Sequence, residues 1–567
     1  MTKKTAAAAF ALLFTGLSAG ALDARLENLE RTVDALVAEQ HAAGQPGGAV
    51  AVLSGDGILL KKCYGLMNVE KKTEITGKTI FDIASLAKQF TAFAVLVLEE
   101  DGLLKLDDDI RVRLSGLPDY EHAITVRHLL QHTSGIPSTD VLRLFGGLSL
   151  DEQWTHQDEI ALIKRYPHLN FEPNTKHVYS NAGYSLLASL VENVGGVGFT
   201  EFMDSRIFKP LGMTSSFFMD EAFGDFDKIA RGYAKKDDGF AEVGSFSDFS
   251  LGGGNMFTSL DDMILWAKNI LSPAVGPRDY LTKISRIDNS LENGNPLIYT
   301  YGFYVRDHKG VPMAEHSGGL PGFRSQVLIF PEDEVIIILM FNNESINTRR
   351  LAAGIADAVF ADKLKEEAPR TRVAVDLDVE RVKAFEGRYL LPDGMEMDFV
   401  LEKDVFRLSL PGNQKFQLFA ESENSFFLKE FDAQCTFVAA EDGTVSEMIW
   451  HQRGEDHAAR RVEEIRSLSP EEIPAYAGRY HQPELEVEYP IVFEDGRLEL
   501  RLPATFKKYL GFESAVLEHV NGDKFHSGWL GMLEFTRGAD GRIDGFILLN
   551  VGRLQNLRFV SGGLSRF

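Results

Sequence analysis

The sequence predicts an α+β domain followed by two small all-β barrel-like domains. Within residues 22–368, strand-like segments stand at both ends and helical segments lie between them, which indicates one antiparallel sheet with a helical insert. Beyond position 369 the pattern changes to short alternating strands separated by Gly and Asp turns. A chain of 567 residues is long enough for several domains.

The two all-β units, expected at 378–465 and 471–567, repeat one another. The sequence AFEGRY at 384–389 matches AYAGRY at 475–480. A repeat of about 90 residues made of short strands is typical of two related barrels or sandwiches. The second copy is longer by about six residues, and we expect the Gly-rich segment 521–529 to form the extra loop.

The first 21 residues have the pattern of a secretory signal. Two lysines precede an apolar run that ends in Ala-Gly-Ala, so cleavage is expected after Ala21. The apolar segment 335–341 has only the length of a strand. We therefore expect an exported protein, periplasmic or secreted, with no integral membrane segment after cleavage.

The composition restricts the class of partner. A net charge of −24 argues against a nucleic acid or an anionic membrane, since either would need a basic face. The two cysteines, Cys63 and Cys435, are far apart in sequence and are interpreted as buried thiols. No cofactor is implied, and the sequence does not specify the oligomeric state.

The first elements follow from periodicity and turn residues. Apolar residues at helical spacing predict an amphipathic helix over 23–43, which ends at a Gly and a Pro. The apolar segments 48–54 and 58–64 flank Gly-Asp-Gly and predict a β-hairpin. Apolar residues recur at helical spacing within the segment 81–101, so it is expected to form a largely buried helix.

The remaining elements of this domain alternate between helices and strands. Helices are expected to start at Thr125 and to cover 182–194 and 259–271, the last after a Gly-Gly-Gly-Asn segment. The closing elements are strands at 300–306, 312–316, 325–331 and 334–342, a loop at 317–323, and an amphipathic helix at 346–366.

Two histidines four residues apart, His128 and His132, have a spacing that can hold zinc on one helix face. No glutamate completes an H-E-x-x-H motif, and the neighbouring acidic residues lack ligand spacing. Capping and packing are the preferred interpretation, and no metal site is predicted.

Ser85 and Lys88 form the first chemically informative pair. They are three residues apart at the start of the predicted helix 81–101 and therefore lie on one face. Free N–H groups at a helix N-terminus stabilise an alkoxide or oxyanion, and the lysine can hold or accept the serine proton. This Ser-x-x-Lys arrangement is typical of serine acyl-transfer enzymes.

Two later segments supply candidate partners. Tyr179 precedes an apolar helix together with Asn181, and His316 precedes Gly318 and Gly319 at the end of a strand. A tyrosine beside an ammonium can act as a base, and Asn can donate to an amide carbonyl. The glycines let a substrate backbone approach, and an N–H there can form half of an oxyanion hole.

Each of these residues also has a purely structural interpretation. Tyr179 can be an aromatic cap, Asn181 the N-cap of the following helix, and His316 a hydrogen-bonded histidine at a strand end. Taken together, and in this order along the chain, the residues are harder to assign to packing alone.

The set resembles the serine penicillin-recognising hydrolases, a family with class C β-lactamases, D-Ala-D-Ala carboxypeptidases, D-aminopeptidases and esterases. The resemblance covers about residues 30–360 and includes the segments 131–135 (QHTSG) and 252–254 (GGG). It implies a β-lactamase-like catalytic domain. It also implies Ser85 as the acylated nucleophile and Lys88 as its activating partner.

The same resemblance assigns the remaining site residues. Tyr179 would be the general base and the acid for the leaving group. The N–H groups of Ser85 and Gly319 would form the oxyanion hole. β-Lactamases and carboxypeptidases carry Lys at the third motif, where this chain has His316, and a mostly neutral histidine weakens the case for a carboxylate-bearing substrate.

The histidine and the two β units resemble the D-aminopeptidase members, in which a loop of the last barrel reaches the active site. We expect the segment 521–529 to play that part. The predicted function is an exported serine hydrolase of small amide, ester or short peptide substrates, D-aminopeptidase-like. The alternatives are a promiscuous carboxylesterase or weak β-lactamase, and, in another class, a non-catalytic penicillin- or peptidoglycan-fragment-binding protein.

Overall fold

The computed structural model describes residues 19–562, except those named at the end of this paragraph. The predicted signal segment therefore lies outside the described residues apart from its last three positions, which begin a helix. Within the described residues, no helix has both the length and the apolar character needed to cross a membrane. The residues left out are 43, 56, 221–225, 238, 245–247, 366–371, 392–395, 411–413, 432, 441–443, 453–454 and 463–467.

The chain forms two compact units. The first contains the residues up to Thr139 and Leu150–Glu366, and the second contains Asp140–Ser149 and Glu367–Phe567. A ten-residue segment in the middle of the first unit's sequence thus belongs to the second unit, which the sequence did not indicate.

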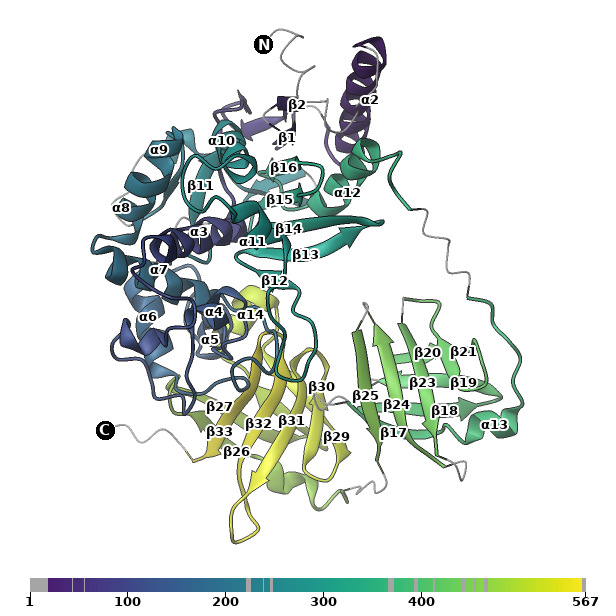
Figure 1. Cartoon of the computed structure of the whole chain (residues 1–567). Helices are drawn as coiled ribbons and strands as arrows, with labels where there is room; N and C mark the ends of the chain where they lie inside the picture. The colour runs from purple at the N-terminus through teal and green to yellow at the C-terminus, as the bar shows by residue number, and fades with distance from the viewer. Residues whose placement is uncertain are drawn as a thin grey trace. The chain divides into compact units, whose positions relative to one another are not determined.

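The first unit is built on one antiparallel sheet of seven strands, as predicted (Figure 1). The predicted hairpin is confirmed, since β1 and β2 pair along their length. β1 and β16 lie next to each other although they are far apart in sequence, and they close the two ends of the domain onto one sheet. In sheet order the strands are β12 (Tyr299–Thr300), β13 (Phe303–His308), β14 (Val311–Leu320), β15 (Phe323–Phe330), β16 (Val335–Phe341), β1 (Gly48–Ser54) and β2 (Gly57–Tyr64).

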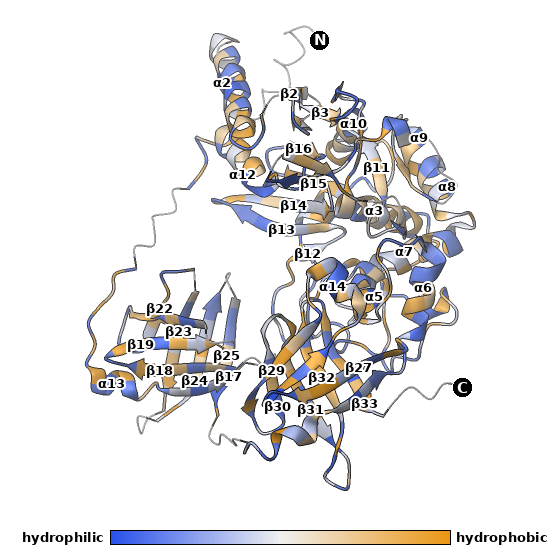
Figure 2. Cartoon of the chain, turned by 180° about the vertical axis from the view of Figure 1, so that it is seen from behind, coloured by the Kyte–Doolittle hydropathy of each residue, from blue (hydrophilic) through white to orange (hydrophobic). Residues whose placement is uncertain are grey.

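Helices cover both faces of this sheet, which explains why β1 and β16 are buried at every position. Alternate residues of β1 enter different cores: Val50 and Val52 pack with α2 (Ala19–Ala38) and α12 (Thr348–Val359). Ala49 and Ala51 pack with the helices of the insert. Figure 2 shows hydrophilic and hydrophobic residues mixed along α2, as expected for a helix with one buried face.

The central helix of the insert is α3 (Ala87–Glu100). Its residues 87–98 are all buried, so the predicted buried helix is confirmed. It begins later than expected, because residues Ala84–Leu86 form a separate 3₁₀ turn, η1. Aromatic rings pack against it, with the centroids of Phe90 and Trp266 4.4 Å apart.

The other predicted helices of the insert are present, and their starts follow capping chemistry. Thr125 caps α4 (Val126–Leu130), and Ser259 caps α10 (Leu260–Leu271), each hydroxyl accepting a backbone N–H from the first turn. The N-cap of α7 (Asn181–Gly195) is Ser180, so Asn181 is the first helical residue and not the cap. The insert also contains α6 (His156–Arg165), α8 (Phe199–Met203), α9 (Lys209–Leu211) and α11 (Tyr280–Ser285). The short helix α5 (Thr139–Phe145) belongs to the second unit apart from its first residue.

The predicted loop at 317–323 is wrong over its first half. Strand β14 continues to Leu320, and Gly318 and Gly319 pair regularly with Ser325 and Arg324 of β15. A Gly-Gly pair usually marks a turn, but here close packing explains the first glycine. A Cβ at Gly318 would lie 2.2 Å from the carbonyl oxygen of Ile83.

The second unit contains the two predicted all-β domains. The first is a nine-stranded antiparallel sheet whose two outer strands, β20 and β21, are neighbours in sequence, and the second is a closed barrel of eight strands. The strands of the first are β17 (Gly387–Leu390), β18 (Glu396–Glu402), β19 (Val405–Leu410), β20 (Gln414–Gln417), β21 (Phe419–Ala420), β22 (Ser425–Phe427), β23 (Ala433–Ala439), β24 (Val445–Gln452) and β25 (Glu455–Arg461). The barrel strands are β26 (Gly478–Gln482), β27 (Val487–Glu494), β28 (Arg497–Arg501), β29 (Ser514–Asn521), β30 (Lys524–Ser527), β31 (Gly531–Arg537), β32 (Ile543–Val551) and β33 (Leu554–Ser561).

The sequence repeat corresponds to a structural repeat. Tyr389 and Tyr480 are both buried in the first strand of their domain. Each tyrosine hydroxyl donates to a carbonyl four residues earlier, that of Phe385 in one copy and that of Tyr476 in the other. The repeated motif therefore encodes one local structure, a tyrosine that ties the entry segment to the first strand.

The extra length of the second copy does not form a loop at 521–529. Residues 524–527 are the barrel strand β30, in which Phe525 is buried. β20 begins three residues after Pro411, whereas its counterpart β29 begins eleven residues after Pro503. The additional residues are the helix α14 (Ala504–Leu510).

Residues 140–149 pack against this helix and the barrel. The rings of Phe145 and Phe506 meet edge to face with centroids 5.1 Å apart, and the Tyr489 hydroxyl donates to the Phe145 carbonyl at 2.8 Å. Thr505 donates to the Leu144 carbonyl. Phe145 is 1% exposed, so its ring is buried within the second unit.

We expect Phe145→Ala to lower the stability of the second unit by about 3–5 kcal/mol, because a buried aromatic side chain is lost and a cavity is left. The midpoint of urea unfolding measures the effect. The matched control is Phe493→Ala in the same unit, since Phe493 is 37% exposed. Equal effects of the two substitutions would contradict the buried role of residues 140–149.

Candidate active site

Ser85 lies in the turn η1 at the start of α3. Its neighbours Ala84 and Leu86 are buried, whereas Ser85 is partly exposed. The φ angle of Ala84 is +50°, a left-handed conformation that is unfavourable for a residue with a Cβ. The chain thus presents one accessible hydroxyl from a strained turn.

Lys88 is fully buried one turn after Ser85. Its ammonium donates to Asn181 Oδ1 at 2.7 Å and to the carbonyl of Gly253, and it lies 4.8 Å from the centre of the Tyr179 ring. A buried charge needs such acceptors, because desolvation without them is costly. These contacts therefore bring together Lys88, Tyr179 and Asn181.

The Gly-Gly-Gly segment supplies one of these acceptors. Thr91 of α3 donates to the carbonyl of Gly252 at 2.9 Å, next to the carbonyl of Gly253 that accepts from Lys88. Gly252 has a φ of +90°, and a Cβ there would lie 2.3 Å from the carbonyl oxygen of Tyr184. Only glycine fits this close approach of the backbone to α7.

The backbone around Tyr179 is held by His132. Val178 N–H donates to the His132 carbonyl at 3.0 Å, and Ser180 N–H donates to His132 Nδ1 at 3.2 Å. The rings of His132 and Tyr179 pack with their centroids 4.2 Å apart. His132 itself has a φ of +57° and is buried.

Sequence reasoning considered His132 only as a packing residue or a zinc ligand, and therefore missed this positioning role. Its neighbour in the motif, His128, caps α4 by accepting the Thr125 N–H at Nδ1. Among the described residues, no group of three or more His, Cys, Asp or Glu side chains could hold a metal ion.

Asn181 is fixed from its other side. Its N–H donates to Ser138 Oγ at 3.0 Å. The next residue, Thr139, donates to the buried carboxylate of Glu159, which also accepts from Ser185 Oγ on α7 at 3.2 Å. The loop at 138–139 and the start of α7 are thus joined through one carboxylate.

His316 faces this cluster from strand β14, with its ring centroid 6.0 Å from that of Tyr179. Its Nδ1 lies 2.7 Å from the carbonyl oxygen of Ser317, and since a carbonyl only accepts, Nδ1 carries the hydrogen. The side chain is 2% exposed, and Nε2 has no hydrogen-bond partner among the described residues.

Burial lowers the pKa of His316 to about 3, and the nearby Lys88 and Arg349 cations act in the same direction. The imidazole is therefore neutral at pH 7, with a lone pair on Nε2. It presents a hydrogen-bond acceptor where a lysine would present a positive charge.

Gly318 and Gly319 lie beside the Ser85 turn, because Gly318 packs directly on Ile83 and Ala84. The seven predicted residues are thus connected: Lys88 contacts Asn181 and Tyr179, Tyr179 neighbours His316, and β14 continues to the glycines.

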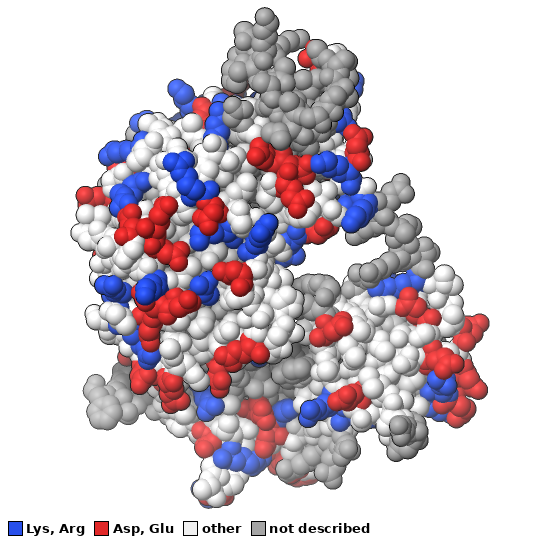
Figure 3. All heavy atoms as spheres, in the orientation of Figure 1, with Lys and Arg blue, Asp and Glu red and all other residues white. Residues whose placement is uncertain are grey.

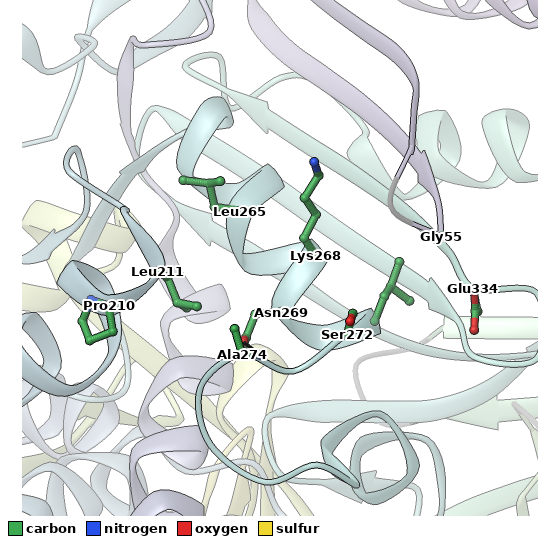
Figure 4. A pocket seen from close by; sticks show the side chains of 10 residues that line it. Gly55, Pro210, Leu211, Leu265, Lys268, Asn269, Ser272, Ala274 and Glu334 are labelled. Carbon is green, nitrogen blue, oxygen red and sulfur yellow. Dashed lines mark hydrogen bonds between the residues drawn. The ribbon is translucent and has the colours of Figure 1, made fainter. Parts of the chain in front are cut away.

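A separate cavity of about 480 Å³ lies elsewhere in the first unit (Figure 4). It is lined by α9, α10 and the strand turns at Gly55 and Glu334. The Glu334 turn joins β15 to β16 at the end opposite Gly318, so this cavity is distinct from the Ser85 site.

Acidic and basic side chains are interspersed on the face shown in Figure 3.

A family model described as Beta-lactamase matches residues 29–361, more than half of the chain. The chain belongs to the beta-lactamase family. With its Ser85-x-x-Lys88 pair it is a serine hydrolase of that family. A second model, described as a domain of unknown function (DUF3471), matches residues 371–465.

Relatives of this family member match both units. Penicillin-binding protein 4* of Bacillus subtilis is 26% identical over 453 residues, which cover 76% of this chain and 98% of that protein. A D-aminopeptidase of Cereibacter sphaeroides is 25% identical, with 83% of this chain and 86% of that protein covered. The solved structure of the octameric penicillin-binding protein homologue from Pyrococcus abyssi has a TM-score of 0.53 at 23% identity, covering 76% of this chain and 99% of that one, and supports the predicted fold.

We expect His132→Ala to lower kcat by about tenfold to a hundredfold with little change in KM, because a small displacement of Tyr179 impairs catalysis more than binding. His132→Asn keeps an acceptor for Ser180 N–H and tolerates the positive φ, so it should retain more activity. Steady-state kinetics on one amide substrate measure both. An Asn variant as impaired as the Ala variant would contradict the backbone-positioning role.

The lowered pKa of His316 predicts a pH dependence of stability. Between pH 6.5 and about 3, the unfolded chain binds a proton at His316 and the folded chain does not. The free energy of unfolding therefore falls as the pH falls through this range. The loss between pH 8 and pH 5 is about 2 kcal/mol. His316→Gln should remove it, whereas His168→Gln, at an exposed position, should not; urea unfolding at both pH values measures this.

Proposed function

We propose that this chain is an exported, D-aminopeptidase-like serine hydrolase that acts on small amide or short peptide substrates through an acyl-enzyme at Ser85. The observation that carries the proposal is the neutral His316. A lysine at this position would attract a substrate carboxylate, but the free Nε2 lone pair accepts a hydrogen bond from an N–H. Substrates that carry an amine or amide N–H at this place fit the site better than carboxylates do.

The proposed reaction uses each residue of the cluster. Tyr179, acting as a phenolate beside the Lys88 ammonium, takes the proton of Ser85 as Oγ attacks the carbonyl carbon. The N–H groups of Ser85 and Gly319 stabilise the oxyanion. The C–N bond then breaks, and Tyr179 returns the proton to the leaving amine.

Deacylation repeats these steps with water. Tyr179 accepts a proton from a water molecule that attacks the ester, and Ser85 regains a proton as the acid leaves. Asn181, held by Lys88 and Ser138, is placed to donate its side-chain amide to the substrate carbonyl that does not react. No cofactor takes part in this scheme.

Two further arguments support the proposal. The match to the Cereibacter sphaeroides D-aminopeptidase extends beyond the catalytic unit and includes part of the β unit. The sequence of residues 1–21 has the charge and hydrophobicity of a secretory signal, which is the basis for proposing export to the periplasm or the medium.

The test is a comparison of initial rates for the mature protein from Leu22 on D-alanyl p-nitroanilide, its L-isomer, p-nitrophenyl butyrate and a chromogenic cephalosporin. We expect the D-amide to be turned over faster than the cephalosporin by at least about tenfold, since the site lacks a lysine at position 316 for the cephalosporin carboxylate. From the similarity to D-aminopeptidases we also expect the D-amide to be turned over faster than the L-amide. Ser85→Ala should abolish every rate.

Ester turnover without amide turnover would support an esterase instead, and preferred cephalosporin turnover would support a β-lactamase. Rates that survive Ser85→Ala would reject the acyl-enzyme at this residue. Secretion is tested separately, by locating the full-length chain and a variant that lacks residues 2–21 in cell fractions.

A further inference from the structure

The turn before Ser85 is unusual in its backbone. Ala84 has a φ of +50°, and its side chain is buried, so neither glycine nor solvent relieves the left-handed conformation. A residue in such a conformation costs of order 1–3 kcal/mol and persists only where surrounding contacts impose it. The contacts that impose it here come from two side chains outside the residue set described above.

The first contact is made by Asp82. Its Oδ1 accepts the N–H of Ala84 at 2.8 Å, closing a short side-chain-to-backbone turn over Ile83. Asp82 is 9% exposed and ends strand β5 (Ile80–Asp82), which pairs with β11 (Met256–Ser259). The acceptor is therefore anchored in a sheet and is not free to follow the turn.

The second contact is made by Ser325 of strand β15. Its hydroxyl donates to the carbonyl oxygen of Ile83 at 2.8 Å, and the side chain is 2% exposed. Ser325 is the direct cross-strand partner of Gly318, which packs on the same carbonyl. One hydroxyl thus joins the nucleophile turn to β15, the strand that pairs with β14, which carries Gly319.

We infer that Asp82 and Ser325 are positioning residues which hold the Ile83–Ala84 turn so that the N–H groups of Ser85 and Gly319 face one substrate oxygen. The inference rests on the proposed roles of Ser85 and Gly319. The two oxyanion donors come from separate elements, and only contacts between those elements can set their separation. Asp82 orients the turn, and Ser325 fixes its distance from β14.

The consequence is a specific kinetic defect. An oxyanion hole stabilises the transition state more than the bound substrate, so a change in the separation of its donors lowers the acylation rate and leaves binding largely intact. Loss of a whole donor costs about 10²–10³ in rate, and a displaced donor should cost less.

The experiment measures the pre-steady-state burst of p-nitrophenol from p-nitrophenyl butyrate, together with the rate of covalent labelling by a fluorophosphonate. We expect Ser325→Ala and Asp82→Ala to lower the acylation rate constant by about tenfold or more, with the concentration for half-maximal burst rate changed less than about twofold. Asp82→Asn keeps the Oδ1 acceptor and should stay within about threefold of the wild type.

The control is Ser216→Ala, because Ser216 is also a buried, hydrogen-bonded serine of the first unit but contacts Thr258 and Asp262. It should leave acylation unchanged. If Ser325→Ala fails to fold, Ser325→Cys keeps the size of the side chain with a weaker donor, and slower acylation is again expected. Thermal unfolding identifies the folded variants.

Acylation at the wild-type rate in folded Asp82→Ala and Ser325→Ala, or in Ser325→Cys, would overturn the inference. So would an Asp82→Asn variant as slow as Asp82→Ala. If these variants acylate at the wild-type rate and the burst still depends on Ser85, the inference fails while the proposed function stands. If labelling and burst survive Ser85→Ala, the proposed function fails first.

Discussion

The catalytic unit depends on the burial of one ammonium group. Lys88 is fully buried near the start of α3, and its acceptors are brought to it from elsewhere in the chain. The carbonyl of Gly253 and the side chain of Asn181 do this, and both come from segments far away in sequence. Because the buried Lys88 ammonium needs these hydrogen-bond acceptors, the Gly-Gly-Gly segment and the start of α7 pack against α3. The residues with proposed catalytic roles are, in this sense, also residues that hold the insert together.

Much of this arrangement follows from local patterns in the sequence. The spacing of Ser85 and Lys88 is a property of one helix, and the apolar segment of β16 is long enough to identify a strand covered on both faces. Gly318 was harder to place, because a Gly-Gly pair is the ordinary mark of a turn and its packing on Ile83 involves a residue more than two hundred positions earlier. The role of His132 was missed for a similar reason: its contacts to the backbone beside Tyr179 become visible only in three dimensions.

The site differs from that of a lysine-bearing member of the family in the group at position 316. A neutral hydrogen-bond acceptor faces the substrate there in place of a positive charge. Around His316 the positive charge is concentrated on Lys88, and the histidine contributes a lone pair. A single substitution of this kind changes which ligands pay a desolvation penalty on entry, while leaving the nucleophile and its turn as they are.

The helix α14 accounts for the principal length difference between the two β repeats. Its Phe506 ring and Thr505 hydroxyl contact residues 140–149. The boundary between the catalytic and β units is therefore not a single position in the gene. A catalytic unit cut off before position 367 would keep Phe145, whose packing partners Tyr489 and Phe506 are encoded some 350 codons later. During evolution, the helix in the barrel and the segment inside the catalytic sequence had to become compatible with each other, so recombination that exchanges only the C-terminal half would leave both without their counterpart.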